Sequence, residues 1–102
     1  MLIAEDDLQV LAAPSRLDVE TRLAFRQAVL AHLERAVEQG EARVILDLRH
    51  TSAIDANGLG ILVLLQKRAR AQGLATRLLH APPVVTELLQ LTKLIPLFEL
   101  EP

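Results

Sequence analysis

Short apolar runs and longer stretches with helical periodicity follow one another along this chain, which predicts alternating strands and helices. Five runs have the length of strands, and the β-branched third run is typical of a strand buried at the centre of a sheet. These runs cover residues 2–4, 8–12, 44–48, 75–79 and 97–100. The stretches between them leave room for three helices.

The first helix is predicted over residues 19–39, where apolar side chains recur at every fourth position. Asp18 precedes it as the expected N-cap, and Glu20 is expected in its first turn, where the helix dipole favours an acid. Gly40 follows its last residue, where a glycine commonly ends a helix.

Two further helices carry equally clear boundary signals. The second is predicted from a cap at Asp55 to about residue 72, and Gly73 ends it. The third opens at Pro82 and Pro83, because proline is tolerated in the first turn of a helix.

The order of elements is therefore β-β-α-β-α-β-α-β, which favours right-handed crossovers and a largely parallel sheet. We expect a single small α/β domain over residues 1–102, a mostly parallel, mixed β-sheet with helices packed on it. In such sheets functional groups lie in loops beyond the carboxyl ends of the strands, and the loop after Leu48 is one of those places. Asp47 is predicted to project from the strand face opposite Leu46 and Leu48 and to be hydrogen-bonded there.

Composition narrows the function classes. Hydrophobic residues make up 51% of the chain, and the absence of cysteine rules out a disulfide framework and fits a cytoplasmic location. The formal charge of −2, with acids and bases interspersed, gives no electrostatic case for nucleic acid or an anionic membrane. The longest apolar stretch, residues 59–65, is too short to span a bilayer, and the acids at 5–7 interrupt any N-terminal signal, so we expect no membrane insertion.

A buried strand at 44–48, the sequence Ile54-Asp55-Ala56-Asn57-Gly58-Leu59-Gly60, and an apolar helix ending at Gln72-Gly73 follow one another along the chain. In this order and spacing they resemble a STAS domain, the family of bacterial anti-sigma factor antagonists. The resemblance spans nearly the whole chain and is strongest from residue 44 to residue 73. Leu17-Asp18 also matches the family's usual start of the first helix. The resemblance implies a non-enzymatic protein that binds an anti-sigma factor, usually an ATP-binding serine kinase, and so frees a sigma factor to direct transcription.

One position departs from the pattern of those relatives. Their kinase switches them off by phosphorylating the Ser or Thr directly after the motif Asp, and here that position is Ala56. Alanine has no hydroxyl and cannot accept a phosphoryl group. The prediction is therefore constitutive binding, unless Thr51 or Ser52, the nearest hydroxyls, serves as a substitute.

The loop after strand 44–48 and the start of the second helix are predicted to form one contact surface. Gly58 and Gly60 each cost about 1 kcal/mol of helix propensity against Ala, which suggests that a backbone, the partner's or the protein's own, approaches closely. Residues 59–65 are apolar all round the helix, so this run is either buried among its neighbours or exposes a patch to a partner. The predicted partner-binding residues are Arg49, His50, Thr51, Ser52, Asp55, Ala56, Asn57, Gly58, Leu59 and Val63.

Two arginines of the first helix, Arg22 and Arg26, fall within its apolar stripe. Arginines placed there either snorkel past the sheet edge or grip an acidic partner. No nucleophile and base, and no phosphate-cradling loop, are recognisable, so no catalytic residue and no cofactor are predicted. The three histidines share no ligand spacing, and no metal site is predicted either.

Two alternatives remain beside this interpretation. Some relatives are small subunits of membrane lipid transporters, bound to an ATPase. A phosphoacceptor receiver domain would use the acidic pair at 6–7, Asp47 and Lys93 in that order around Mg²⁺. A receiver needs a helix directly after the acidic pair, where residues 8–14 favour a strand and a turn, and Asp47 is predicted inside its strand rather than at its end.

Overall fold

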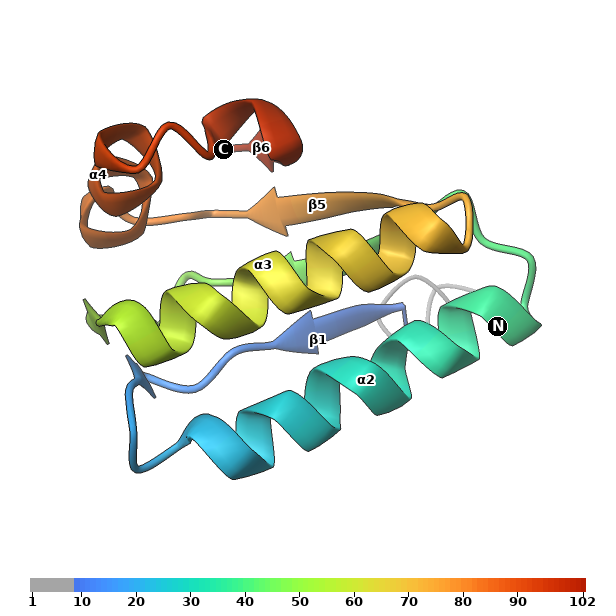
Figure 1. Cartoon of the computed structure of the whole chain (residues 1–102), viewed down its shortest axis with the longest axis horizontal. Coiled ribbons are helices and arrows are strands. Elements are labelled where there is room, and N and C mark those ends of the chain that lie inside the picture. Colours follow the sequence, from blue (N-terminus) through green and yellow to red (C-terminus); the bar gives the residue numbers. More distant parts are fainter. Residues whose placement is uncertain (1–8) are drawn as a thin grey trace.

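A parallel sheet of four strands lies at the centre of the computed structural model, which describes residues 9–102 (Figure 1). Its spatial order is β1-β3-β5-β6, and every strand pair within the described residues is parallel. The strands are β1 (Val10–Ala12), β3 (Arg43–Asp47), β5 (Ala75–Leu79) and β6 (Glu99–Glu101). The predicted run 44–48 is thus a central strand, and the expected strand at 2–4 lies outside the described residues.

Two helices cover one face of this sheet side by side, both running in the same direction (Figure 1). They are α2 (Arg22–Glu38) and α3 (Ala56–Ala71), and each connects one parallel strand to the next. Gly40 and Gly73 follow them with positive φ angles of 68° and 81°, the left-handed conformation in which glycine ends a helix. The predicted helix ends are confirmed.

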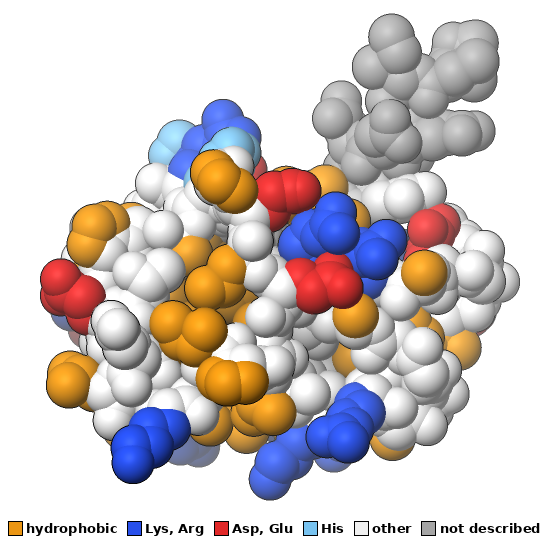
Figure 2. Space-filling view, turned by 90° about the horizontal axis from the view of Figure 1, so that it is seen from above, with side chains coloured by type: hydrophobic (Ala, Val, Ile, Leu, Met, Phe, Trp, Pro, Cys, Tyr) orange, Lys and Arg blue, Asp and Glu red, His pale blue; other side chains and the backbone are white. Residues whose placement is uncertain are grey.

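The remaining elements join β5 to β6. The helix α4 (Pro83–Leu91) begins after Pro82, and a short 3-10 helix, η1 (Ile95–Leu97), precedes β6. The last strand therefore begins at Glu99 and not at residue 97 as predicted, because Leu97 is the last residue of η1 and Phe98 is its C-cap. In the view from above, hydrophobic side chains gather on the side where α4 lies (Figure 2).

The core lies between the sheet and the pair α2 and α3, as the strand alternation requires. Val44 and Leu46 of β3 are buried, whereas Arg43, Ile45 and Asp47 on the opposite face are only partly so. Helical side chains complete the core, among them Phe25, Val29 and Leu33 from α2 and Ile61, Leu62 and Leu65 from α3. The fold class predicted from the sequence is confirmed.

The opposite face of the sheet carries an ion-pair cluster across three strands. Glu99 accepts hydrogen bonds from Arg43 Nε at 3.0 Å and from Arg77 Nε at 3.1 Å, and Arg77 also lies 3.5 Å from Glu101. The hydrogen bond from Arg43, together with the bond from Arg77, lowers the pKa of Glu99 although burial raises it. Both acids of this cluster, Glu99 and Glu101, are therefore paired with an arginine.

Two features that involve the segment before α2 were not predicted. A second, two-stranded parallel sheet pairs β2 (Arg16–Leu17) with β4 (Ala53–Ile54). The N-cap of α2 is Thr21, not Asp18, so Glu20 lies before the helix and not in its first turn. Asp18 instead accepts hydrogen bonds from the amides of Glu20 and Thr21 and from Arg16 Nε, and it thereby fixes the turn between β2 and α2.

Candidate functional site

The loop after β3 begins with an internal ion pair. The Asp47 carboxylate accepts the Arg49 amide at 2.9 Å and Arg49 Nε at 3.0 Å. Asp47 is the last residue of β3, which corrects the prediction that it lies inside the strand, and its side chain is on the face opposite Leu46 as predicted. Arg49 and His50 are both exposed at this end of the sheet.

The two hydroxyl residues of this loop differ in accessibility. Thr51 is buried, at 3% exposed, and its hydroxyl donates to the Pro14 carbonyl at 2.9 Å. Ser52 is exposed, and its amide donates to the Ser15 carbonyl at 2.8 Å. Both residues tie the loop to the segment before β2, but only Ser52 presents a side chain to solvent.

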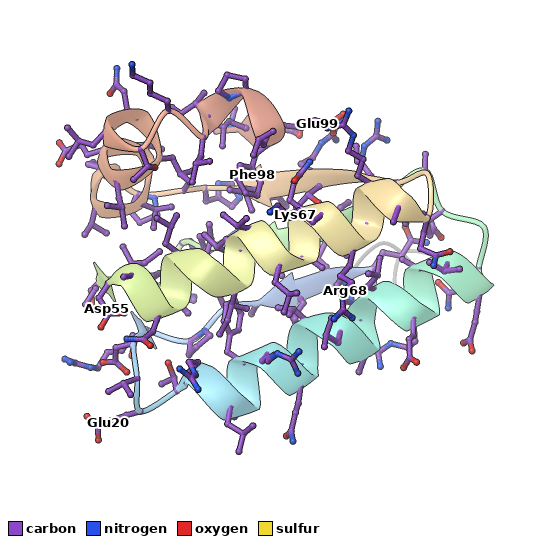
Figure 3. The ribbon with its side chains drawn as sticks, viewed as in Figure 1. Glu20, Asp55, Lys67, Arg68, Phe98 and Glu99 are labelled. Atoms are coloured by element: carbon purple, nitrogen blue, oxygen red, sulfur yellow. The ribbon has the colours of Figure 1, made fainter. Side chains whose placement is uncertain are left out.

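Asp55 is the N-cap of α3, as predicted. Its backbone is extended, and its Oδ1 accepts the amides of Asn57 at 2.8 Å and Gly58 at 3.3 Å. The residue stands at the exposed start of the helix (Figure 3), and Ala56 beside it is exposed as well. The start of α3 at Asp55 and Ala56 is therefore an accessible corner of this molecule.

The two glycines of α3 have different surroundings. A Cβ on Gly58 would lie against the Leu17 carbonyl oxygen and 2.5 Å from Leu17 Cβ, so the backbone that approaches Gly58 is the protein's own β2. Gly58 is buried, and it lets α3 contact the small sheet. Apart from the adjacent backbone of α3 itself, a Cβ on Gly60 would have no atom within 4 Å, and Gly60 is exposed.

The apolar run of α3 is largely accounted for by the fold. Ile61, Leu62 and Leu65 are buried in the core, and Leu59 packs against the core's margin. Val63 is half-exposed. Of the predicted site residues, Thr51 and Gly58 are thus buried, and Asn57, Leu59 and Val63 are partly buried. The others are exposed: Arg49, His50, Ser52, Asp55 and Ala56.

A groove follows the contact between α2 and α3 next to this corner. Its volume is about 420 Å³, and its walls include Arg22 and Arg26 from α2 and Asn57 and Gly60 from α3. The two arginines are exposed at this groove. The predicted site did not include this groove, and the sequence signal that could have found it was the pair of arginines four residues apart.

A second, larger groove of about 630 Å³ continues between the C-terminal halves of the same helices, where Leu30, Val37 and Arg68 line it. Figure 3 shows Arg68 between the two helices. Within residues 9–102, no three metal-ligating side chains form a cluster. No helix of this part of the chain is long and apolar enough to cross a membrane.

The sequence matches the profile of the STAS domain over residues 4–102, and the protein therefore belongs to the STAS domain family. A crystal structure of a protein from Thermotoga maritima, provisionally described as an anti-sigma factor antagonist, has the same fold with a TM-score of 0.75. It is 23% identical in sequence, and the match covers 92% of this chain and 80% of the other. No curated protein sequence matches this chain.

Proposed function

We propose that this protein is a non-enzymatic, cytoplasmic regulator that binds an anti-sigma factor of the serine kinase type and so frees a sigma factor. One observation carries the proposal: the helix start within the STAS motif is exposed at Asp55 and Ala56, and hydrogen bonds and packing beneath it hold it in place. The Asp55 cap and the contact of Gly58 with Leu17 fix its position. A contact surface that is already ordered loses little entropy when a partner binds.

The chemistry of this corner supports binding that phosphorylation does not switch off. Ala56 occupies the position of the hydroxyl, and the Thr51 hydroxyl is buried in a hydrogen bond to Pro14. Ser52 is the exposed hydroxyl of the loop, three positions before the motif Asp. We therefore expect the protein to stay bound to a partner kinase in the presence of ATP.

The test starts from capture of the partner in the source organism, followed by mass spectrometry to identify it. The purified partner is then incubated with this protein and ATP, and the intact mass of the protein is measured. An anti-sigma factor that leaves the mass unchanged supports the proposal, and a phosphate on Ser52 supports substitution. An ATPase of a membrane transport complex as the captured partner would replace the proposal by the lipid-transport role.

Two alanines of α3 provide a matched pair for the contact surface. Ala56 and Ala71 are both exposed, at opposite ends of the helix. Ala56→Gln should weaken partner binding on the order of tenfold, because the minority of interface positions that dominate binding cost more than about 1 kcal/mol each when they are changed. Ala71→Gln should leave binding unchanged, and both variants should melt within a few degrees of the wild type. Equal effects of the two variants on binding would contradict the assigned surface.

The variant Ala56→Ser tests the missing switch. If the partner is a kinase that docks on the STAS motif, this hydroxyl should gain one phosphate, and the added charge should release the complex. Phosphoserine is tolerated at a helix N-terminus, so release should occur without unfolding. A partner kinase that binds the variant and leaves it unmodified would argue against docking at the motif.

A further inference from the structure

Gly60 is a glycine of α3 that the protein's own fold does not explain. Its backbone is helical, it is exposed, and an added Cβ would meet no atom within 4 Å other than the adjacent backbone of α3. Alanine at this position would favour the helix by about 1 kcal/mol. The glycine therefore leaves open a space outside α3, not a space that the molecule fills with its own atoms.

That space is the groove that α3 shares with Arg22 and Arg26. Both arginines are exposed, and neither forms an ion pair within the described residues, whereas Arg43 and Arg77 of the sheet do. Arg22 Nη1 donates only to Asn57 Oδ1, at 3.4 Å across the groove. No residue that lines the groove carries a carboxylate. The groove thus holds two positive charges and no negative one, although the whole chain has a formal charge of −2.

The base of the groove is apolar. Ile61 and Leu64 line it together with Ala56. Asp55 already accepts two of the first amides of α3, and its own negative charge stands at the helix start. A small, highly charged anion would meet that carboxylate and few free amides there. A peptide with separated carboxylates and an apolar side chain between them fits this combination better.

We propose that this groove binds an acidic segment of the partner protein. Its carboxylates would pair with Arg22 and Arg26, and an aliphatic side chain would pack over Gly60 and Leu64. The inference rests on the proposed protein-binding function and assigns the chemistry of the partner beside the corner at Asp55. Because both arginines are exposed, each pair should contribute modestly and should weaken in salt.

The experiment titrates the isotope-labelled full chain with the peptide Glu-Leu-Glu-Glu-Leu-Glu, blocked at both ends, and follows its NMR chemical shifts. The matched peptide has glutamine in place of every glutamate. We expect saturable shifts at millimolar peptide, centred on the Gly60 and Asn57 amides and the Nε–H groups of Arg22 and Arg26. The glutamine peptide should bind more weakly by a factor of about five or more, given the strength of two exposed ion pairs.

Three variants separate the groove from general charge. Arg22→Gln with Arg26→Gln should reduce binding as much as the glutamine peptide does, and Arg68→Gln with Arg70→Gln at the far end of α3 should not. At Gly60 an added Cβ meets no other part of the fold, and the rest of a leucine side chain would extend into the groove. Gly60→Leu should therefore abolish binding while the melting temperature stays the same or rises.

The proposal is overturned by absence of saturable shifts, by equal binding of both peptides, or by shifts centred on Arg68 and Arg70. Inorganic phosphate at the same concentration is the control for a small-anion site, and equal shifts in the groove with phosphate would also overturn it. Because the probe is a peptide, the result does not depend on finding an anti-sigma factor. If the peptide binds here but the captured partner is not an anti-sigma factor, the assignment of the groove stands and the proposed function is wrong.

Discussion

The substitutions Gly58→Ala and Gly60→Ala place the same methyl group on the same helix, two residues apart, and should change stability in opposite directions. At Gly58 the new Cβ would lie 2.5 Å from Leu17 Cβ and 2.9 Å from the Leu17 carbonyl carbon. The obstacle is mostly backbone of β2, so α3 and the β2–β4 sheet must move apart. At Gly60 the new methyl group has no atom within 4 Å except the adjacent backbone of α3.

The magnitudes follow from these surroundings. Overpacking costs about 1–3 kcal/mol, and a clash with backbone belongs at the upper end of that range. The higher helix propensity of alanine returns about 1 kcal/mol at both positions. Gly58→Ala should therefore destabilise the protein by about 2 kcal/mol, and Gly60→Ala should stabilise it by about 1 kcal/mol.

The assay is unfolding in urea and by heat, followed by far-ultraviolet circular dichroism, because the chain contains neither tryptophan nor tyrosine. The difference of about 3 kcal/mol between the variants corresponds to roughly 12–24 °C in melting temperature. If Gly58→Ala is as stable as the wild type, α3 does not approach Leu17 as closely as described. If Gly60→Ala is destabilised, the space beside Gly60 is filled by the protein itself.

Two further variants test the capping residue of α3 and a buried histidine. Asp55→Ala should lower the free energy of unfolding by about 0.5–2 kcal/mol, because two amides lose their acceptor, while Asp55→Asn should stay near the wild type; equal losses would show that charge, not capping, matters. His32 is buried, which lowers its pKa below the ordinary 6.5 although its bond to the Ile45 carbonyl raises it, and the charge of Arg35 lowers it further. The unfolded chain then binds more protons below pH 6.5, so the folded state should lose stability as pH falls through that value, by at most about 1.4 kcal/mol per pH unit. In His32→Gln this loss should be smaller when urea unfolding is measured one pH unit above and one below 6.5, and an unchanged pH dependence would assign the effect to another group.

Local signals in the sequence were sufficient for most of the framework. The run at residues 44–48 predicted the central strand because its apolar side chains are buried by α2 and α3 on one face. Gly40 and Gly73 predicted helix ends because a left-handed residue is needed there, and both have positive φ. Asp55 predicted a cap because the acceptor and the amides it binds are neighbours in sequence.

The features that the sequence did not predict depend on residues far apart in the chain. The strands β2 and β4 have two residues each, too few to show a period, and they exist because each supplies the other's hydrogen bonds. The need for glycine at position 58 comes from Leu17, and the groove comes from the placement of α2 beside α3, where Arg22 reaches an Asn57 that is 35 residues away. Asp18 was assigned to the wrong role because a capped turn and a capped helix have the same short-range pattern.

The residues at the start of α3 differ in whether the protein's own fold uses them. Asp55 and Gly58 both serve the fold, because Asp55 caps the first turn of α3 and Gly58 contacts Leu17. Ala56 and Gly60 contact little or nothing of the protein itself and are exposed. Changes at the first pair should therefore lower the stability of the fold, and with it binding at this surface, whereas changes at the second pair should alter binding without destabilising the fold. Substitutions at Ala56 and Gly60, including replacement of Ala56 by a phosphorylatable serine, should therefore leave intact the fold that holds the start of α3 in place.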